Sequence, residues 1–331
     1  MQSERNSSAA LIVDELSIDI KGSTVVDGVS FDIGKGEILA IVGESGCGKS
    51  LTALSIMGLL EGDVRISGGH ILFDDKDLVS LSDADWKDIR GNKLTMIFQE
   101  PIESLNPLMR AGAQVGESLL VHGQADKASV QHDTIAMLRK VGIPDAEQRV
   151  SQYPFELSGG MCQRLMIASA LITQPQLLIA DEPTTALDVT VQAQILELMK
   201  NLRREQGTAI LIITHDLGVV ADIADRVCVM YGGRTAEIAP VDALFTRPAH
   251  PYTRMLLATI PSLTGTRKRK LRFIEGTVPD FSEWPDGCRF RTRCPLADAA
   301  CEHTPPLVPL RSGDASHTVA CWHTDRLGEL Q

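Results

Sequence analysis

The chain has 331 residues, of which 44% are apolar, so its length supports one large domain and a smaller one. The formal net charge of −11 argues against a general nucleic-acid binder, because binding to a polyanion is favoured by an excess of positive charge. No apolar run reaches the ~18 residues that a membrane-spanning helix needs, and the N-terminus lacks the apolar segment of a secretory signal; we therefore expect a cytosolic protein whose seven cysteines form no disulfide framework.

The N-terminal part of the chain alternates apolar and polar residues as antiparallel strands do, and this predicts a β-subdomain. A glycine-rich loop follows, and residues 51–60 after it have helical composition. A helical insertion without strands is expected between about 105 and 170, with its pattern clearest from 115 to 150. The strands expected in this half are residues 11–20, 24–26, 29–33 and 37–42, a hairpin at 68–75, and residues 94–98.

Short apolar runs in the second half are typical of buried parallel strands. They cover residues 176–180, 209–213 and 226–231, with a helix expected at 189–204. Strands that alternate with helices, with polar residues at the strand ends, predict an α/β core whose site lies along that edge.

After about residue 261 the composition changes to a linker, expected at 264–270, and then to a tail rich in Pro, Arg and Cys. The basic run at 267–272 is interpreted as a solvated linker or, alternatively, as a contact to a membrane surface or a partner. With so few large apolar residues, the tail needs another source of order.

The glycine-rich loop has the spacing, and the strand, loop and helix context, of a P-loop. Its N–H groups would surround phosphate oxygens, and the following helix points its positive end at the same anion. Lys49 is expected to reach the β- and γ-phosphates and Ser50 to bind Mg²⁺, whereas a chance glycine-rich turn is the alternative. The expected phosphate-binding residues are Gly43, Glu44, Ser45, Gly46, Cys47, Gly48, Lys49, Ser50 and Leu51.

Polar residues follow three of the other apolar strands. Asp181 is placed to hold Mg²⁺ through water beside Ser50, and Glu182 to face the water that attacks the γ-phosphate; a solvent-facing charge pair at a helix N-terminus is the alternative. Gln99 is expected to bind the metal or orient water. His215 is expected within reach of the γ-phosphate, although a lone histidine there would more often be structural.

A second anion-binding helix start is predicted at Ser158, Gly159 and Gly160. Two phosphate-binding loops on one chain cannot easily serve one phosphate group from one side. We therefore infer that the second loop serves the nucleotide of a neighbouring subunit.

Together with residues 186–188, these motifs resemble the nucleotide-binding subunit of ATP-binding-cassette transporters over roughly residues 10–260. The resemblance implies an α/β P-loop cassette with a RecA-like parallel-sheet core, an antiparallel β-subdomain and a helical subdomain. It also implies that two subunits sandwich two ATP molecules, each between one P-loop and residues 158–160 of the other subunit. Glu182 would be the general base or water-positioning residue, His215 the γ-phosphate contact, and Asp188 part of the dimer seam.

In that family, hydrolysis reopens the sandwich, and the Gln99 loop and helical insertion pass the motion to membrane subunits. Two positions depart from the wider pattern. Ile20 stands where an aromatic residue usually stacks on adenine, so the base would be held weakly or by apolar contact. Met161 stands where glutamine is common, and methionine is usual there in one branch.

That branch contains the ATPase subunits of dipeptide and oligopeptide permeases, to which residues 96–101, 104–107, 153–160 and 250–254 are similar. Residues 52–60 resemble the D-type chain, which implies a heterodimer with an F-type ATPase. The resemblance divides the chain into a cassette at 1–260 and an extension at 261–331.

The branch implies an ATPase that lies peripherally on the cytoplasmic face of the membrane and energises peptide import. Its partners would be two transmembrane permease subunits and, indirectly, a solute-binding protein, with no nucleic acid and no direct contact with the substrate. Import of nickel, glutathione or another small solute by the same machinery is the alternative.

Four cysteines in the extension, Cys288, Cys294, Cys301 and Cys321, could close around a metal centre. Four thiolates suit zinc or a [4Fe–4S] cluster. In the branch this segment is associated with an iron–sulfur cluster, which we favour over zinc and over free thiols. A tail with few large apolar residues would gain order from such a centre.

Two other classes of function compete with this one. A soluble cassette ATPase that acts on DNA or ribosomes would usually carry a coiled-coil insertion or two cassettes in one chain, and this sequence shows neither. A non-hydrolysing regulatory cassette would lack Lys49, Glu182 or the motif at 158–160, and all three are present.

Overall fold

The computed structural model describes residues 9–185, 187–260, 273–311 and 314–330. The expected linker, the basic run at 267–272 and Ala186 lie outside the described residues. The described chain divides into two compact units. Unit 1 contains residues 9–11, 32–38 and 72–213, and unit 2 contains residues 12–31, 39–71 and 214–330.

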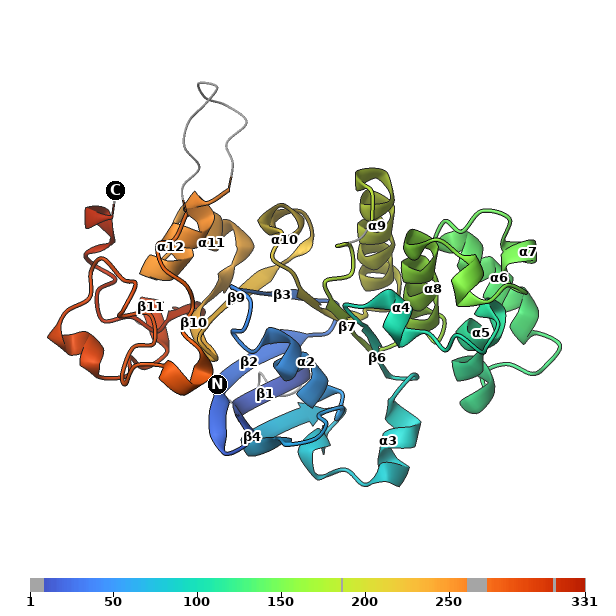
Figure 1. Cartoon of the computed structure of the whole chain (residues 1–331), viewed down its shortest axis with the longest axis horizontal. Helices are drawn as coiled ribbons and strands as arrows, with labels where there is room; N and C mark the ends of the chain where they lie inside the picture. Colours follow the sequence, from blue (N-terminus) through green and yellow to red (C-terminus); the bar gives the residue numbers. More distant parts are fainter. Residues whose placement is uncertain (1–8, 186, 261–272, 312–313, 331) are drawn as a thin grey trace, which may run out of the picture. The chain divides into compact units, whose positions relative to one another are not determined.

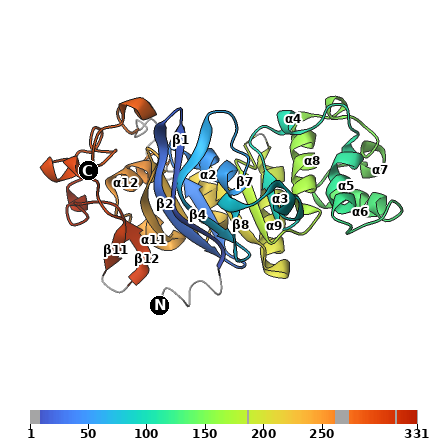
Figure 2. The same ribbon diagram turned by 90° about the horizontal axis from the view of Figure 1, so that it is seen from below.

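Strands and helices of the described chain carry the labels of Figures 1 and 2. The strands are β1 (Ala9–Ile20), β2 (Ser23–Gly34), β3 (Ile38–Val42), β4 (Val64–Phe73), β5 (Lys76–Asp77), β6 (Leu94–Ile97), β7 (Leu177–Asp181), β8 (Ala209–Ile213), β9 (Arg226–Tyr231), β10 (Arg234–Pro240), β11 (Val308–Arg311) and β12 (Asp314–Val319). The α-helices are α2 (Lys49–Ile56), α3 (Asp83–Ile89), α4 (Pro101–Ser104), α5 (Ala111–Val121), α6 (Val130–Lys140), α7 (Ala146–Arg149), α8 (Gly159–Leu171), α9 (Val189–Gln206), α10 (Leu217–Ile223), α11 (Val241–Thr246) and α12 (Pro251–Ala258). The 3₁₀ turns are η1 (Leu78–Ser80), η2 (Pro154–Glu156), η3 (Phe281–Glu283), η4 (Ala299–Glu302) and η5 (Leu327–Glu329).

Unit 1 contains three parallel strands in the order β6, β7, β8. The middle strand is in register with both neighbours, since Ile179 is opposite Met96 and Leu211. All residues of these three strands are buried, which confirms the prediction of buried parallel strands for the runs at 176–180 and 209–213. Because the strands are parallel, the residues that follow them are presented at one edge of the sheet.

The described residues from 105 to 170 in unit 1 contain helices and turns and no strand. Helices α5, α6 and α8 pack on one another, and α4 packs on α8 (Figure 1, green). Leu138 and Val141 are buried, whereas Ile135 and Met137 are only half-buried.

Strands β2, β1 and β4, most of whose residues belong to unit 2, lie side by side in this order (Figure 2, blue). The prediction of separate strands at 24–26 and 29–33 is wrong, because β2 is continuous through Gly28 with φ +63° there. In β1 the buried side chains are Leu11 and Val13, and then Leu16 and Ile18, so the alternation of buried and exposed residues shifts by one position between the two pairs. The change coincides with Glu15, at φ +48°, as in a β-bulge.

A second set of strands in unit 2 follows the order β3, β9, β10, β12, β11. The β3–β9 pair is parallel, with Ile41 opposite Cys228, and the other pairs are antiparallel. The C-terminal tail thus adds two strands to this sheet, which the sequence did not predict. Pairing with β10 is one source of the order that the tail requires.

A buried carboxylate connects these elements. Glu237 in β10 is 0% exposed, and its carboxylate accepts hydrogen bonds from the N–H of Ala249 (2.7 Å), the N–H of His250 (2.9 Å) and Nε2 of His317 in β12 (2.8 Å). Burial lowers the pKa of His250 to about 4, so that its ring is neutral and its Nδ1 accepts a hydrogen bond from the N–H of Tyr252 (3.0 Å), at the start of α12. One side chain therefore anchors both α12 and β12 to β10.

Replacing Glu237 with Ala is expected to destabilise the chain by about 3–5 kcal/mol, because three buried donors lose their acceptor. The thermal unfolding midpoint, followed by circular dichroism, should fall by at least ~5 °C. The exposed Glu283→Ala is the matched control and should change stability by less than about 0.5 kcal/mol. Equal midpoints for the two variants would contradict the anchoring role.

Candidate functional site

The glycine-rich loop joins the fully buried strand β3 to helix α2. Gly43 has φ +155°, and a Cβ there would lie 2.2 Å from the carbonyl oxygen of Met230. Gly48 has φ +92°, and a Cβ there would lie 2.8 Å from Cγ2 of Val26. Any larger residue at these two positions would displace neighbouring chain, so the loop can keep this path only with glycine.

Lys49, the first residue of α2, points back over the loop. Its side chain is largely buried, and Nζ donates to the carbonyl oxygens of Gly43 (2.9 Å) and Glu44 (3.0 Å). Nζ also lies 3.6 Å from Sγ of Cys47, whose pKa burial raises, so that this residue is a neutral thiol. A buried ammonium group beside the N-terminus of a helix can attract and bind a phosphate group.

His215 lies in the same unit as this loop. The N–H of Thr214 donates to the carbonyl oxygen of Ile41 (3.3 Å), which places the chain just before His215 alongside the end of β3. Asp216 caps α10 by accepting from the N–H groups of Gly218 (2.8 Å) and Val219 (3.3 Å). The capped turn leaves the His215 side chain exposed.

Asp181 and Glu182 lie at the carboxyl end of β7 in unit 1. Asp181 is buried, and Glu182 has a left-handed backbone with φ +49°. The N–H of Glu182 donates to the carbonyl oxygen of Ile213 (2.9 Å), and the Glu182 carboxylate accepts from Oγ1 of Thr185 (3.0 Å). A left-handed glutamate costs ~1–3 kcal/mol, and such strained residues occur preferentially at functional sites.

The motif at 158–160 starts helix α8, as predicted. Ser158 is its N-cap and accepts from the N–H of Met161 (3.3 Å), and both Ser158 and Gly159 are exposed. The buried Gln163 donates from Nε2 to the carbonyl oxygen of Pro183. This bond connects α8 to the segment that directly follows Glu182.

Two further predicted residues belong to unit 1. Asp188 is the N-cap of α9 and accepts from the N–H groups of Thr190 and Val191, both at 3.0 Å. Gln99 is exposed, two residues after β6. Unit 1 thus holds Gln99, residues 158–160, Asp181, Glu182 and Asp188, whereas the glycine-rich loop and His215 belong to unit 2.

Two residues that sequence reasoning did not assign to the loop also contact it. Tyr252 accepts a hydrogen bond from the N–H of Glu44 at its phenol oxygen (2.9 Å), and Arg293 forms an ion pair with the Glu44 carboxylate (2.9 Å). These residues are 208 and 249 positions from Glu44 in the chain. No local pattern signals contacts over such separations.

The four cysteines of the tail are neighbours in the fold. The N–H of Cys288 donates to the carbonyl oxygen of Cys301 (3.0 Å), and negative charge on Cys288, Cys294 or Cys301 would raise the pKa of Cys321. Burial raises the pKa of Cys294 to about 11 and that of Cys321 to about 12. In the absence of a metal, Cys294 and Cys321 are therefore neutral thiols at pH 7.

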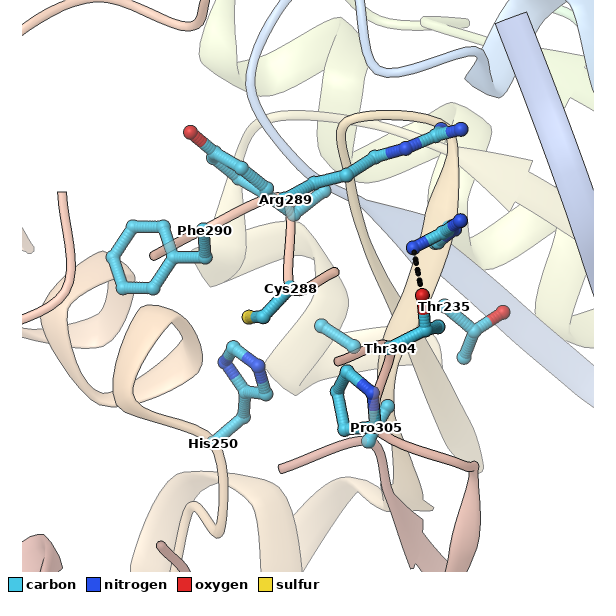
Figure 3. Close-up of a pocket in the computed structure, with 11 residues that line it drawn as sticks. Thr235, His250, Cys288, Arg289, Phe290, Thr304 and Pro305 are labelled. Atoms are coloured by element: carbon cyan, nitrogen blue, oxygen red, sulfur yellow. Dashed lines mark hydrogen bonds between the residues drawn. The ribbon is translucent and has the colours of Figure 1, made fainter. Parts of the chain in front are cut away.

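Near the cysteines, Asp298, Cys301 and His323 offer three ligand-type atoms within 4.8 Å of one another. Nε2 of His323 lies 2.9 Å from the Asp298 carboxylate. Figure 3 shows Cys288 with its sulfur directed toward the ring of the buried His250, in a small pocket whose wall includes Phe290.

Comparison with known proteins identifies relatives of the part of the chain that contains the phosphate-binding loop and of the C-terminal part. Residues 26–185 match the family described as "ABC transporter", and residues 236–301 match "Oligopeptide/dipeptide transporter, C-terminal region". The dipeptide transport ATP-binding protein DppD of Bacillus subtilis is 50% identical over 317 residues, which cover 95% of this chain and 94% of that protein. The oligopeptide transport ATP-binding protein AppD of the same organism is 51% identical over 308 residues, 92% of this chain and 93% of that protein.

Solved structures include a similar fold. A dimeric ATP-binding cassette in a post-hydrolysis state with ADP and Pi has a TM-score of 0.64 and 26% identity, and covers 70% of this chain and 98% of its own. The expected mixed α/β cassette fold is confirmed by this likeness. None of the helices in the described part of the chain combines the length and apolar character needed to cross a membrane.

Proposed function

The chain belongs to the ATP-binding subunits of ABC transporters, in the oligopeptide/dipeptide transporter family, and from this premise we propose that it binds and hydrolyses ATP to drive the import of peptides. The observation that carries the proposal is the loop between β3 and α2. Its path excludes side chains at Gly43 and Gly48, and the buried Lys49 ammonium group lies over it. This geometry suits the phosphates of a nucleotide.

The reaction requires water to attack the γ-phosphorus while the bond to the β,γ-bridging oxygen breaks, which yields ADP and phosphate. Lys49 would bind the β- and γ-phosphates, and Ser50 and Asp181 would hold Mg²⁺, which neutralises the charge that develops on the leaving group. Glu182 would orient the water and accept its proton, with Thr185 fixing the carboxylate. His215 would contact the γ-phosphate, and Gln99 would bind the metal or orient water.

We assign Ser158, Gly159 and Gly160 to the nucleotide of a partner ATPase. The exposed Ser158 and the start of α8 support this assignment, because they can receive a phosphate group from outside the chain. The strained Glu182 and the start of α8 are connected through Gln163 and the carbonyl of Pro183. Closure around ATP would then act on both elements. The partner would be an F-type ATPase, and Asp188 would lie at the seam.

Two membrane permease subunits would receive the motion. Large apolar side chains follow Gln99 in unit 1, with Ile102 66% exposed and Leu108 86% exposed. Contact with a membrane subunit would bury such residues, which a monomer in water leaves exposed at a cost. The chain would therefore act peripherally at the cytoplasmic face, and a solute-binding protein would select the cargo.

Peptides are the cargo that the relatives' names indicate. The test is uptake in cells that lack this gene and need a dipeptide or oligopeptide as the source of an essential amino acid. Loss of growth, restored by the intact gene, is the expected result. Normal peptide-dependent growth, with a defect confined to nickel or glutathione uptake, would instead support the alternative cargo.

We further propose that Cys288, Cys294, Cys301 and Cys321 hold a [4Fe–4S] cluster. A zinc ion bound to four thiolates at about 2.3 Å would bring the sulfur atoms within about 3.8 Å of one another. In the described part of the chain, the set of ligand-type atoms that lie within 4.8 Å of one another comes from Asp298, Cys301 and His323, and it contains a single sulfur atom. Because no three of the four sulfur atoms form such a set among the described residues, the thiols suit a centre larger than one ion, and the cluster would order the tail.

Protein purified without oxygen is expected to be brown and to contain about four iron atoms per chain. Cys294→Ser should remove most of the iron, since one ligand is lost. The matched control is Cys228→Ser, which changes a buried thiol of β9 outside the group and should keep the iron. Colourless protein with one zinc ion per chain would overturn the cluster assignment, as would iron that survives Cys294→Ser.

A further inference from the structure

The C-terminal cysteine segment, which is the described part of the tail from residue 273 on, contacts the phosphate-binding loop through Arg293. Nη1 of Arg293 lies 2.9 Å and 3.1 Å from the two carboxylate oxygens of Glu44. The arginine side chain is only 6% exposed and that of Glu44 is 26% exposed. A charge-assisted contact shielded to this degree is worth more than a surface ion pair.

Arg293 is itself held by the C-terminal segment. Nε donates to the carbonyl oxygen of Glu275 (3.0 Å) and Nη2 to that of Gly276 (3.2 Å). Its own N–H donates to the carbonyl oxygen of Phe290 (3.0 Å), within the turn that connects Cys288 to Cys294. The guanidinium group therefore has a fixed position before it reaches Glu44, and the ion pair costs little additional side-chain entropy.

The backbone of Glu44 has a second support. Its N–H donates to the phenol oxygen of Tyr252 (2.9 Å), which is fully buried in α12. Tyr252 packs against Tyr231 and Phe290, with ring centroids 4.8 Å and 5.4 Å away. Phe290 belongs to the same turn as Arg293 and lies beside Cys288 in Figure 3. Both the backbone and the side chain of Glu44 are thus held by the last third of the chain.

We propose that Arg293 is a positioning residue for nucleotide binding, which fixes Glu44 and neutralises its charge at the start of the phosphate-binding loop. The inference rests on the proposed function. An unpaired carboxylate at this point of the loop would repel the phosphates of a nucleotide. A loop that is held in place before binding also loses less conformational entropy when the nucleotide arrives. The cysteine segment therefore contributes to the affinity for ATP without touching it.

The experiment measures the dissociation constant of MgATP for the full chain, by displacement of a fluorescent ATP analogue. Arg293→Met is expected to weaken binding about tenfold, equivalent to ~1.4 kcal/mol. Arg293→Lys, which keeps the charge, should stay within about threefold of wild type. The double variant Arg293→Met with Glu44→Gln should also recover to about threefold, because the repelling carboxylate is gone.

Arg291→Met is the matched control, since Arg291 lies two residues earlier in the same turn and its buried Nε has no hydrogen-bond partner in the described part of the chain. It should bind MgATP as wild type does. Arg293→Met binding within twofold of wild type would overturn the inference, and so would a double variant as weak as Arg293→Met alone, because the loss would then arise from damage to the segment. Failure of the wild-type chain to bind MgATP would overturn the proposed function as well.

Discussion

Replacing Glu182 with Gln is expected to lower the ATPase turnover by about 10²–10⁴-fold while ATP binding is retained. The amide has nearly the shape of the carboxylate but cannot accept the proton of the attacking water. The backbone at this position is left-handed (φ +49°), and its N–H donates a hydrogen bond to the carbonyl oxygen of Ile213. Neither feature involves the side chain, so the local fold should persist. The measurement is phosphate release at saturating ATP, with the dissociation constant of MgATP determined in parallel.

A matched control is Glu205→Gln, an exposed glutamate near the end of α9 in the same unit. It should leave turnover unchanged. The Glu182→Gln variant, by contrast, should accumulate as a closed dimer with the partner ATPase when ATP is present, which size-exclusion chromatography would detect. A Glu182→Gln turnover within about threefold of wild type would rule out the proposed role of this carboxylate.

Replacing Lys49 with Ala is expected to weaken MgATP binding by at least about 10²-fold, because a charged donor to the phosphates is lost from a buried position. Nζ here lies over the carbonyl oxygens of Gly43 and Glu44, within the loop that would hold the phosphates. Equilibrium binding of a fluorescent ATP analogue is the direct measurement.

Lys35→Ala, which removes an exposed lysine in the turn before β3, is the control and should bind ATP normally. A Lys49→Ala variant with wild-type affinity would show that the loop does not hold the phosphates. Comparison with Glu182→Gln separates the two halves of the proposal, since one variant is expected to lose binding and the other only the chemical step.

Local chemistry explains why much of the fold could be predicted. The strand, loop and helix around Lys49, the start of α8 at Ser158 and the buried strands β7 and β8 all follow from short patterns in the chain. Helix caps and continuous apolar runs are properties of consecutive residues, so they need no knowledge of distant contacts. The roles of Gln99, Glu182 and His215 in catalysis stay predictions until the variants are measured.

Two features of the strands could not be predicted, for a different reason. The separate strands expected at 24–26 and 29–33 form one strand, β2, and the N–H of Gly28 between them donates to Oγ of Ser17. The shift of alternation at Glu15 in β1 likewise does not follow from the residue pattern. It occurs where Gly69 approaches the backbone so closely that a Cβ on Gly69 would lie 2.4 Å from the Glu15 carbonyl oxygen. Contacts between strands decided both points.

By itself the sequence determined the phosphate-binding loop, the order of the motifs, the family and the presence of four clustered cysteines in the tail. Only the tertiary structure decided that β12 of this tail pairs with β10, that Glu237 is buried beneath both, and that Arg293 reaches Glu44. The physical reason is separation along the chain. Glu44 and Arg293 are 249 residues apart, and the ion pair is accompanied by contacts of Arg293 with Tyr231 and of Glu44 with Tyr252 that only the folded chain provides.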